Sequence, residues 1–92
     1  RSFFIMANKL WDAEQQVFRL SLKELRLTAQ LTQKELATKL SKPQSYVSKY
    51  ESGERKLDYL EVREICNQCS SSIIELEKTL ATKLNKEPKL RL

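Results

Sequence analysis

Hydrogen-bonding side chains occupy one face of the short helix that the sequence predicts over residues 44–52. With ~100° between successive helical residues, Val47, Tyr50 and Glu51 fall on one side. The opposite side carries only small or polar residues, namely Gln44, Ser45, Ser48, Lys49 and Ser52. That side has no acidic residue, as expected of a surface that lies against phosphates. The pattern therefore favours contact with a polyanion.

The residue types on this face match the hydrogen-bonding groups of DNA base pairs. Gln44 can donate and accept at once, which suits N6 and N7 of adenine, and Lys49 can donate to O6 and N7 of guanine. Ser45 and Ser48 can reach either a base edge or a phosphate. The alternative at this point is a helix face that meets only solvent.

Four capping-box patterns predict where helices begin. In each, a Ser, Thr or Asp is followed three residues later by Glu or Gln, so that the two side chains satisfy free N–H groups of the first turn. The pairs are Asp12/Gln15, Thr32/Glu35, Asp58/Glu61 and Ser72/Glu75. Together with the apolar spacing, they predict helices over residues 13–28, 33–40, 44–52, 59–68 and 73–83.

Two residues predict the ends of helices in the middle of the chain. Pro43 disfavours the helical conformation at Lys42, which predicts a tight turn between the second and third helices. Gly53 is the only glycine, and we expect it in the left-handed conformation after the third helix. The residues predicted to face the core are Val17, Leu20, Leu25, Ala29, Leu36, Ala37, Leu40, Val47, Tyr50, Val62, Ile65, Cys66, Cys69, Ile73, Leu76 and Leu80.

Length and composition point to one small all-α domain, a compact five-helix bundle. The chain has 92 residues, of which 40% are hydrophobic and 32% charged, with one Gly and two Pro. We expect the domain to span residues 12–84. Residues 1–11 are then an N-terminal extension or an expression remnant, and residues 85–92 a flexible tail.

The charge distribution permits a polyanionic partner. The net charge is +5, and residues 30–56 carry six Lys/Arg against three Glu. Residues 57–80 carry two Lys/Arg against five acids. One part of the domain is therefore expected to meet phosphate and another to face away from it.

Other functional classes fit the sequence poorly. No apolar run approaches the roughly 20 residues of a membrane span, so we expect a cytoplasmic protein. Cys66 and Cys69 offer too few ligands for structural zinc because the chain has no His, and they are interpreted as core thiols in a reducing compartment. No catalytic constellation, cofactor motif or small-molecule ligand site is apparent, so an enzyme is not expected.

Two segments carry a family resemblance. The first is Thr32-Gln33-Lys34-Glu35-Leu36-Ala37, and the second runs from Gln44 to Gly53 with the letters QSYVSKYESG. They resemble the phage repressor and Cro type of helix-turn-helix, the xenobiotic-response-element (XRE) family, and the likeness extends over about residues 22–77. The resemblance implies a helix-turn-helix in the second and third helices of a five-helix bundle. It also implies a sequence-specific transcription regulator that acts as a dimer.

The resemblance assigns roles to individual positions. Base-reading positions correspond to Gln44, Ser45 and Lys49. The resemblance implies contacts to the DNA backbone from Gln33, Ser52, Arg55 and Lys56, and we add Thr32, Tyr46 and Ser48 to this group. Arg26 and Glu51 correspond to a buried ion pair between the first and third helices. An exposed phosphate contact by Arg26 is the competing interpretation, but an inward-facing Glu51 without a partner would be costly.

Several residues depart from the family pattern. Gln30 and Ser41 stand where glycines are common, so an altered backbone is expected at both. Pro43 replaces the usual polar cap of the third helix, and Leu57 replaces a frequent proline. None of these changes removes a position assigned to DNA contact, but we expect them to affect the angle at which the third helix enters the groove.

We expect a double-stranded-DNA-binding transcriptional regulator, of the repressor kind, that inserts helix 44–52 into the major groove as a homodimer. The fifth helix is the expected dimer surface, through Ile73, Ile74, Leu76 and Leu80. The alternative is a protein-interaction module of the same fold, such as an antitoxin or adaptor, with little DNA binding. Such a module would tolerate acids on the exposed face of helix 44–52.

Overall fold

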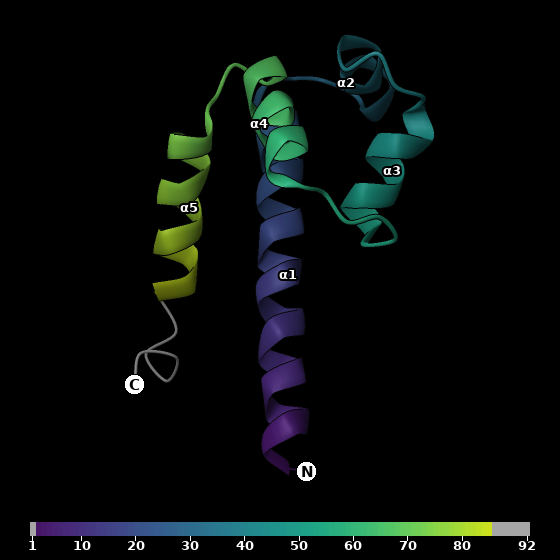
Figure 1. Ribbon diagram of the computed structural model, residues 1–92. Helices are drawn as coiled ribbons and strands as arrows, with labels where there is room; N and C mark the ends of the chain where they lie inside the picture. The colour runs from purple at the N-terminus through teal and green to yellow at the C-terminus, as the bar shows by residue number, and fades with distance from the viewer. Residues whose placement is uncertain (1, 86–92) are drawn as a thin grey trace.

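The computed structural model describes the backbone of residues 2–85 and the side chains of residues 12–85. This part of the chain forms five helices and no strand (Figure 1). The helices are α1 (Ser2–Thr28), α2 (Gln33–Lys39), α3 (Gln44–Ser52), α4 (Tyr59–Gln68) and α5 (Ile73–Asn85). The predicted all-α fold of five helices is confirmed.

Side-chain caps fix the starts of three helices. At α2, the Glu35 N–H donates to Oγ1 of Thr32 at 3.0 Å, and the Thr32 N–H donates to Oε1 of Glu35 at 2.8 Å. Asp58 and Glu61 form the same reciprocal box at α4, with distances of 2.8 and 3.0 Å. Ser72 accepts from the Glu75 N–H at 3.1 Å at the start of α5. These caps explain why the predicted starts hold.

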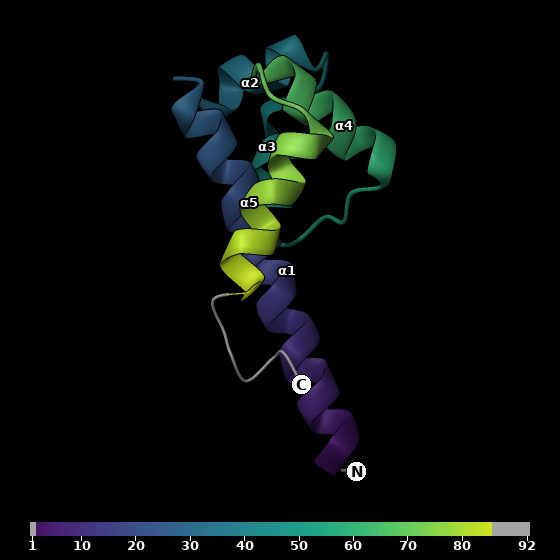
Figure 2. The same cartoon turned by 90° about the vertical axis from the view of Figure 1, so that its left-hand side faces the viewer.

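The start of α1 differs from the prediction. The helix begins at Ser2 rather than near Ala13, so Asp12 lies inside it and cannot cap it. Nothing between residues 2 and 12 interrupts a helix, because that stretch has no Gly or Pro. The domain boundary expected after residue 11 therefore falls within a continuous helix, whose first part extends beyond α5 (Figures 1 and 2).

The far end of the domain also differs slightly from the prediction. α5 ends at Asn85, two residues later than expected, so the first residue of the expected tail is helical. The rest of that tail, residues 86–92, lies outside the described residues. None of the helices between residues 2 and 85 has the length and apolar character needed to cross a membrane.

The core lies where all five helices meet. Its buried members are Leu22, Leu36, Ala37, Tyr46, Val47, Tyr50, Val62, Ile65, Cys66, Cys69 and Leu76. The predicted core faces of α2, α4 and α5 are confirmed. On α1 the prediction was wrong for Leu20, which is 49% exposed, while the neighbouring Leu22 is fully buried.

Both cysteines are core residues, as predicted. Cys66 is 0% and Cys69 is 6% exposed, and neither forms a disulfide. Burial raises the pKa of the Cys66 thiol to about 11 and also raises the pKa of Cys69. In the described part of the chain, no group of three or more potential metal ligands comes together.

Left-handed residues end the first four helices. Gly53 has φ 93°, and three residues other than glycine share this conformation, Gln30 at 62°, Ser41 at 58° and Ser70 at 58°. After each, the next N–H donates to the carbonyl five residues earlier, as in the bond from Lys42 to Ala37 at 2.9 Å. The altered backbone expected at Gln30 and Ser41 is thus confirmed, whereas Ser70 was not foreseen.

Candidate nucleic-acid interface

Helices α2 and α3 lie together on the side of α1 that faces away from α5 (Figures 1 and 2). The turn between them is closed by the left-handed Ser41 and by Pro43, whose carbonyl accepts from the Tyr46 N–H at 3.0 Å. Val47 and Tyr50, 0% and 1% exposed, anchor α3 in the core. A short helix is thereby held with one face inward and one face outward.

The outward face of α3 carries the predicted base-reading residues. Its exposed members are Gln44, Ser45, Ser48, Lys49 and Ser52. None is acidic. Within residues 12–85, Gln44, Ser45 and Lys49 form no side-chain hydrogen bond, so their donors and acceptors are available to a ligand.

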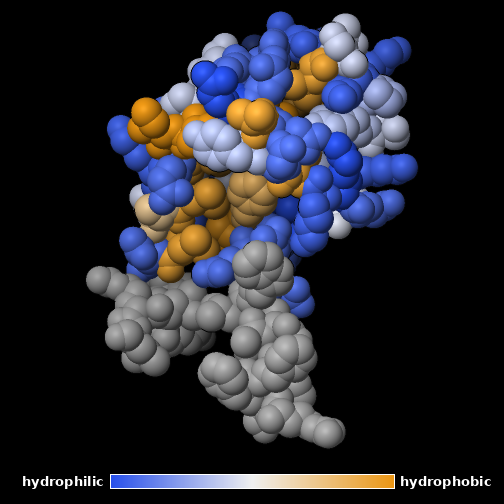
Figure 3. All heavy atoms as spheres, viewed as in Figure 1, coloured by the Kyte–Doolittle hydropathy of each residue, from blue (hydrophilic) through white to orange (hydrophobic). Residues whose placement is uncertain are grey.

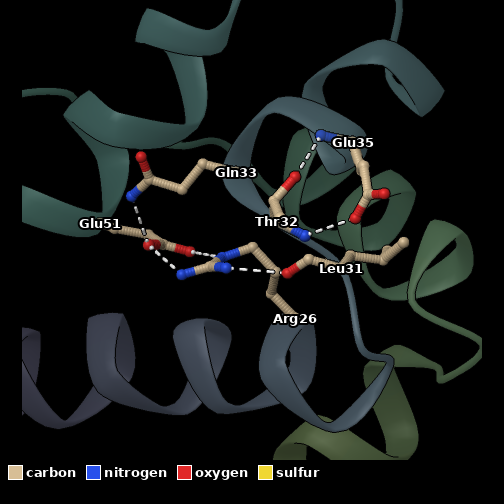
Figure 4. A network of polar contacts seen from close by, with 6 residues as sticks. All are labelled: Arg26, Leu31, Thr32, Gln33, Glu35 and Glu51. Atoms are coloured by element: carbon tan, nitrogen blue, oxygen red, sulfur yellow. Dashed lines mark hydrogen bonds and ion pairs between the residues drawn. The ribbon is translucent and has the colours of Figure 1, made fainter.

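A buried polar network fixes α3 to α1 and α2 (Figure 4). Arg26 donates from Nε to Oε2 of Glu51 at 2.7 Å and from Nη2 to Oε1 at 3.1 Å. Its Nη1 donates to the Leu31 carbonyl at 2.8 Å, and Nε2 of Gln33 donates to Oε1 of Glu51 at 3.0 Å. The Arg26 and Glu51 side chains are 8% and 5% exposed. This is the position in which the family resemblance places an ion pair.

The network determines the charge of the α3 surface. The hydrogen bond to Glu51 raises the pKa of Arg26, so the guanidinium stays charged. Because two N–H groups of that guanidinium face the carboxylate, the only acid of α3 is compensated inside the protein. The residues of the helix consequently add no negative charge to its outward face, although Glu54, in the loop that follows, accepts from the Ser52 hydroxyl at 3.3 Å.

The two candidate backbone contacts at the start of α2 have structural partners. Oγ1 of Thr32 is used by the cap, although the residue is exposed. Gln33 is half-buried, and its side-chain amide donates to Glu51. Gln33 thus connects a position assigned to the DNA backbone with the network that orients α3.

Tyr46 lies mostly inside the domain. Its side chain is buried, with 9% of the residue exposed, and its hydroxyl donates to Oε2 of Glu61 at 3.1 Å. Its ring packs edge-to-face against Tyr50, with centroids 5.7 Å apart. This position leaves little of Tyr46 exposed for a contact with the DNA backbone, which stays a prediction.

The loop after α3 presents the remaining predicted contacts. The Ser52 hydroxyl donates to the Lys49 carbonyl at 3.0 Å. Arg55 lies 4.9 Å from the centre of the Tyr46 ring, and its Nη2 donates to Glu61 at 2.5 Å. Lys56 is exposed and forms no ion pair within residues 12–85. Lys56 therefore offers an uncompensated charge, whereas the charge of Arg55 is partly compensated.

Glu61 has a role that the sequence did not reveal. Beyond capping α4, it accepts from both Tyr46 and Arg55. The hydrogen bond from the Asp58 N–H, followed by those from Tyr46 and Arg55, lowers the pKa of Glu61. Its capping-box position was the only available signal, and that signal accounts for just one of its three partners.

Comparisons with known proteins agree with this geometry. A family model described as Helix-turn-helix matches residues 22–76, which include all of α2, α3 and α4. A solved structure described as an XRE-family like protein from Pseudomonas syringae pv. tomato str. DC3000 is 36% identical, with a TM-score of 0.78. The match covers 85% of this chain and 95% of that chain. This chain belongs to the XRE family of helix-turn-helix proteins.

Membership of the XRE family indicates the function of the surface formed by α2 and α3. The protein is a DNA-binding regulator of the XRE type, and α2 and α3 are its helix-turn-helix. The matched region begins at Leu22, so the first turns of α1 lie outside it. The comparison with curated proteins finds no match.

Proposed function

We propose that this XRE-family protein is a sequence-specific transcriptional repressor that inserts α3 into the major groove of double-stranded DNA as a dimer. The acid-free outward face of α3 is the observation that carries the proposal. A surface helix usually mixes Glu and Lys, but this face offers only hydrogen-bonding groups and one positive charge. The major groove presents hydrogen-bonding base edges between two phosphate backbones, which favours that combination.

The roles within the interface follow from exposure and partners. Gln44, Ser45 and Lys49 are free to contact base edges because no other group of the domain occupies them. Lys56 supplies a charge to the DNA backbone, and Arg55 does so in competition with Glu61. The further positions for backbone contact are Thr32, Gln33, Ser48 and Ser52. The buried network fixes the base-reading residues of α3 relative to the backbone-contact position at the start of α2, because Glu51 of α3 and Gln33 of α2 both belong to it.

Alanine at a base-reading position should have a different effect from alanine at a backbone position. We expect Lys49→Ala and Gln44→Ala each to cost about 1–3 kcal/mol on the preferred site and to relax the choice of base. Lys56→Ala should weaken all duplexes alike and flatten the dependence of affinity on salt. Selection from random duplex DNA gives the site, and fluorescence anisotropy at several salt concentrations measures each variant.

The contrast between the two kinds of variant is decisive. Equal losses on every sequence from all three substitutions would rule out base reading by α3. A folded protein that enriches no duplex at all would favour the protein-interaction alternative instead.

The proposed dimer surface needs revision in the light of the core. Leu76 is 3% exposed, and Ile73 and Leu80 pack against the core, so these three largely serve the fold. Ile74 is 67% exposed. An apolar surface runs over α5 and between α5 and α1 (Figure 3), where a groove of about 320 Å³ includes Phe18 and Leu80. We propose that Ile74 and the rim of this groove form the contact between two copies.

A charge at Ile74 should separate the copies. We expect Ile74→Lys to convert a dimer into a monomer without lowering the stability of the domain, because the side chain projects into solvent. Sedimentation velocity at several concentrations measures the change. Leu60→Lys is the matched control, since Leu60 is 68% exposed on α4 and should leave the dimer intact. A wild-type protein that sediments only as a monomer at high concentration would exclude the surface.

A further inference from the structure

A cavity of about 260 Å³ lies between α1 and the loop that follows α3. Three basic residues contribute to its wall, Arg19 from α1 and Arg55 and Lys56 from the loop. The apolar residues of the wall are Phe18, Leu22 and Leu57. Among the side chains of residues 12–85, none of those in the wall is acidic. A partly open hollow with an apolar lining and several converging cations is suited to an organic anion.

The charge of Arg19 is available to a ligand. Arg19 is half-buried, and within residues 12–85 it forms no hydrogen bond or ion pair. Its guanidinium lies against Gly53, where an added Cβ would approach Cζ of Arg19 to 3.0 Å. The left-handed glycine, with φ 93°, therefore ends α3 and also leaves room for this guanidinium. Lys56 likewise has no acidic partner in this part of the chain.

One residue of the wall, Tyr50, carries a buried hydroxyl without a hydrogen-bond partner in the described structure. The residue as a whole is 1% exposed. A buried hydroxyl without a partner is unfavourable, and nearly all such groups in folded proteins have one. The groups whose charges act on the pKa of this hydroxyl are Glu51, Cys69, Tyr46 and Arg26, which lie outside the wall, so the hydroxyl is not counted among the groups that the cavity offers to a ligand.

We propose that this cavity binds a small organic anion that carries a phosphate or carboxylate group. The anionic group lies between Arg19 and Lys56, and the apolar body packs on Phe18 and Leu57, which are half-buried. The volume falls just below the roughly 300–1,000 Å³ typical of drug-sized ligands, which limits the body to about one ring. Two charge-assisted contacts compensate the ligand charge on entry.

Binding would also regulate the protein. This step rests on the proposed function, which assigns Lys56 to the DNA backbone. An anion held by Lys56 neutralises the charge that the backbone would otherwise meet, so an occupied cavity lowers the affinity for DNA. The same oxyanion chemistry could instead be supplied by a DNA phosphate, and the experiment distinguishes the two sources.

Titration of the isolated protein with phenyl phosphate and with benzoate tests the site in the absence of DNA. We expect saturable shifts of the Gly53 and Leu57 amide resonances, with weaker binding of phenol, which lacks the charge, and of inorganic phosphate, which lacks the ring. Arg19→Met should raise the Kd about tenfold or more, because it removes a charge-assisted contact. Arg19→Lys should retain most of the affinity. Arg63→Met, at an exposed arginine of α4 outside the cavity, should leave the Kd unchanged.

Three outcomes would overturn the proposal. The first is the absence of saturable shifts with both probes in a wild-type protein whose spectrum is that of a folded domain. The second is equal affinity of the wild type and Arg19→Met. The third is a loss of DNA affinity in Arg19→Met without probe binding to the wild type, which would assign the cations to a DNA phosphate and leave the proposed function standing. Competition of phenyl phosphate with DNA in the wild type, but not in Arg19→Met, supports both the site and its regulatory effect.

Discussion

Arg26→Ala is expected to destabilise the folded domain by about 3–5 kcal/mol. The substitution leaves the Glu51 carboxylate, whose side chain is 5% exposed, without its guanidinium partner. It also removes the donor of the Leu31 carbonyl. An unpaired charge in such a position costs far more than the intact pair contributes, because the pair had already compensated the loss of hydration. Urea denaturation followed by circular dichroism measures the loss.

An exposed ion pair between α1 and α5 provides the control. Glu24 accepts from Lys83 at 2.6 Å, but the two side chains are 60% and 30% exposed. Glu24→Gln should therefore cost less than about 1 kcal/mol. The double variant Arg26→Met with Glu51→Met should recover most of the stability lost in Arg26→Ala, since no buried charge remains. A similar loss in Arg26→Ala and Glu24→Gln would show that the Arg26 pair is not buried in solution.

Sequence reasoning predicted the ends of α2, α3 and α4 to within a residue because those ends depend on nearby side chains. Thr32 and Asp58 satisfy N–H groups three residues away, and Gly53 ends α3 through its own backbone. The start of α1 could not be found in this way. Asp12 and Gln15 have the same spacing as a true cap, but a cap pattern has no effect where the preceding residues continue the helix.

For the candidate interface, the sequence predicted which face of α3 is exposed but not the contacts of individual side chains with distant parts of the chain. The spacing of Val47 and Tyr50 identified the inward side of α3, and the opposite residues are exposed. The burial of Tyr46 was not predicted, because two of its partners are Glu61, on another helix, and Arg55, in the loop that follows α3. The cavity beside Arg19 depends likewise on α1 meeting a loop far along the chain. Such distant partners leave no local pattern.

The different burial of Leu20 and Leu22 leads to a second substitution with a large expected effect on stability. Leu20 and Leu22 are two positions apart on α1, so their side chains point in directions ~200° apart and only one can face the core. The spacing of Val17 and Leu20 favoured Leu20. The structure leaves Leu20 49% exposed and Leu22 fully buried. A buried Arg26 could have indicated the correct face, because it lies four residues after Leu22 and therefore on the same side of the helix.

We therefore expect Leu22→Ala to destabilise the domain by about 2–5 kcal/mol and Leu20→Ala by about 0.5 kcal/mol or less. The first substitution opens a cavity in the buried cluster that also contains Leu36 and Ile65, whereas the second removes a side chain that water already reaches. Both leucines occupy interior positions of the same helix, so the change in helix propensity is the same and cancels in the comparison. Urea denaturation of the two variants gives the difference directly. Equal losses would mean that α1 is rotated about its axis in solution, and the Arg26 pair could then not form.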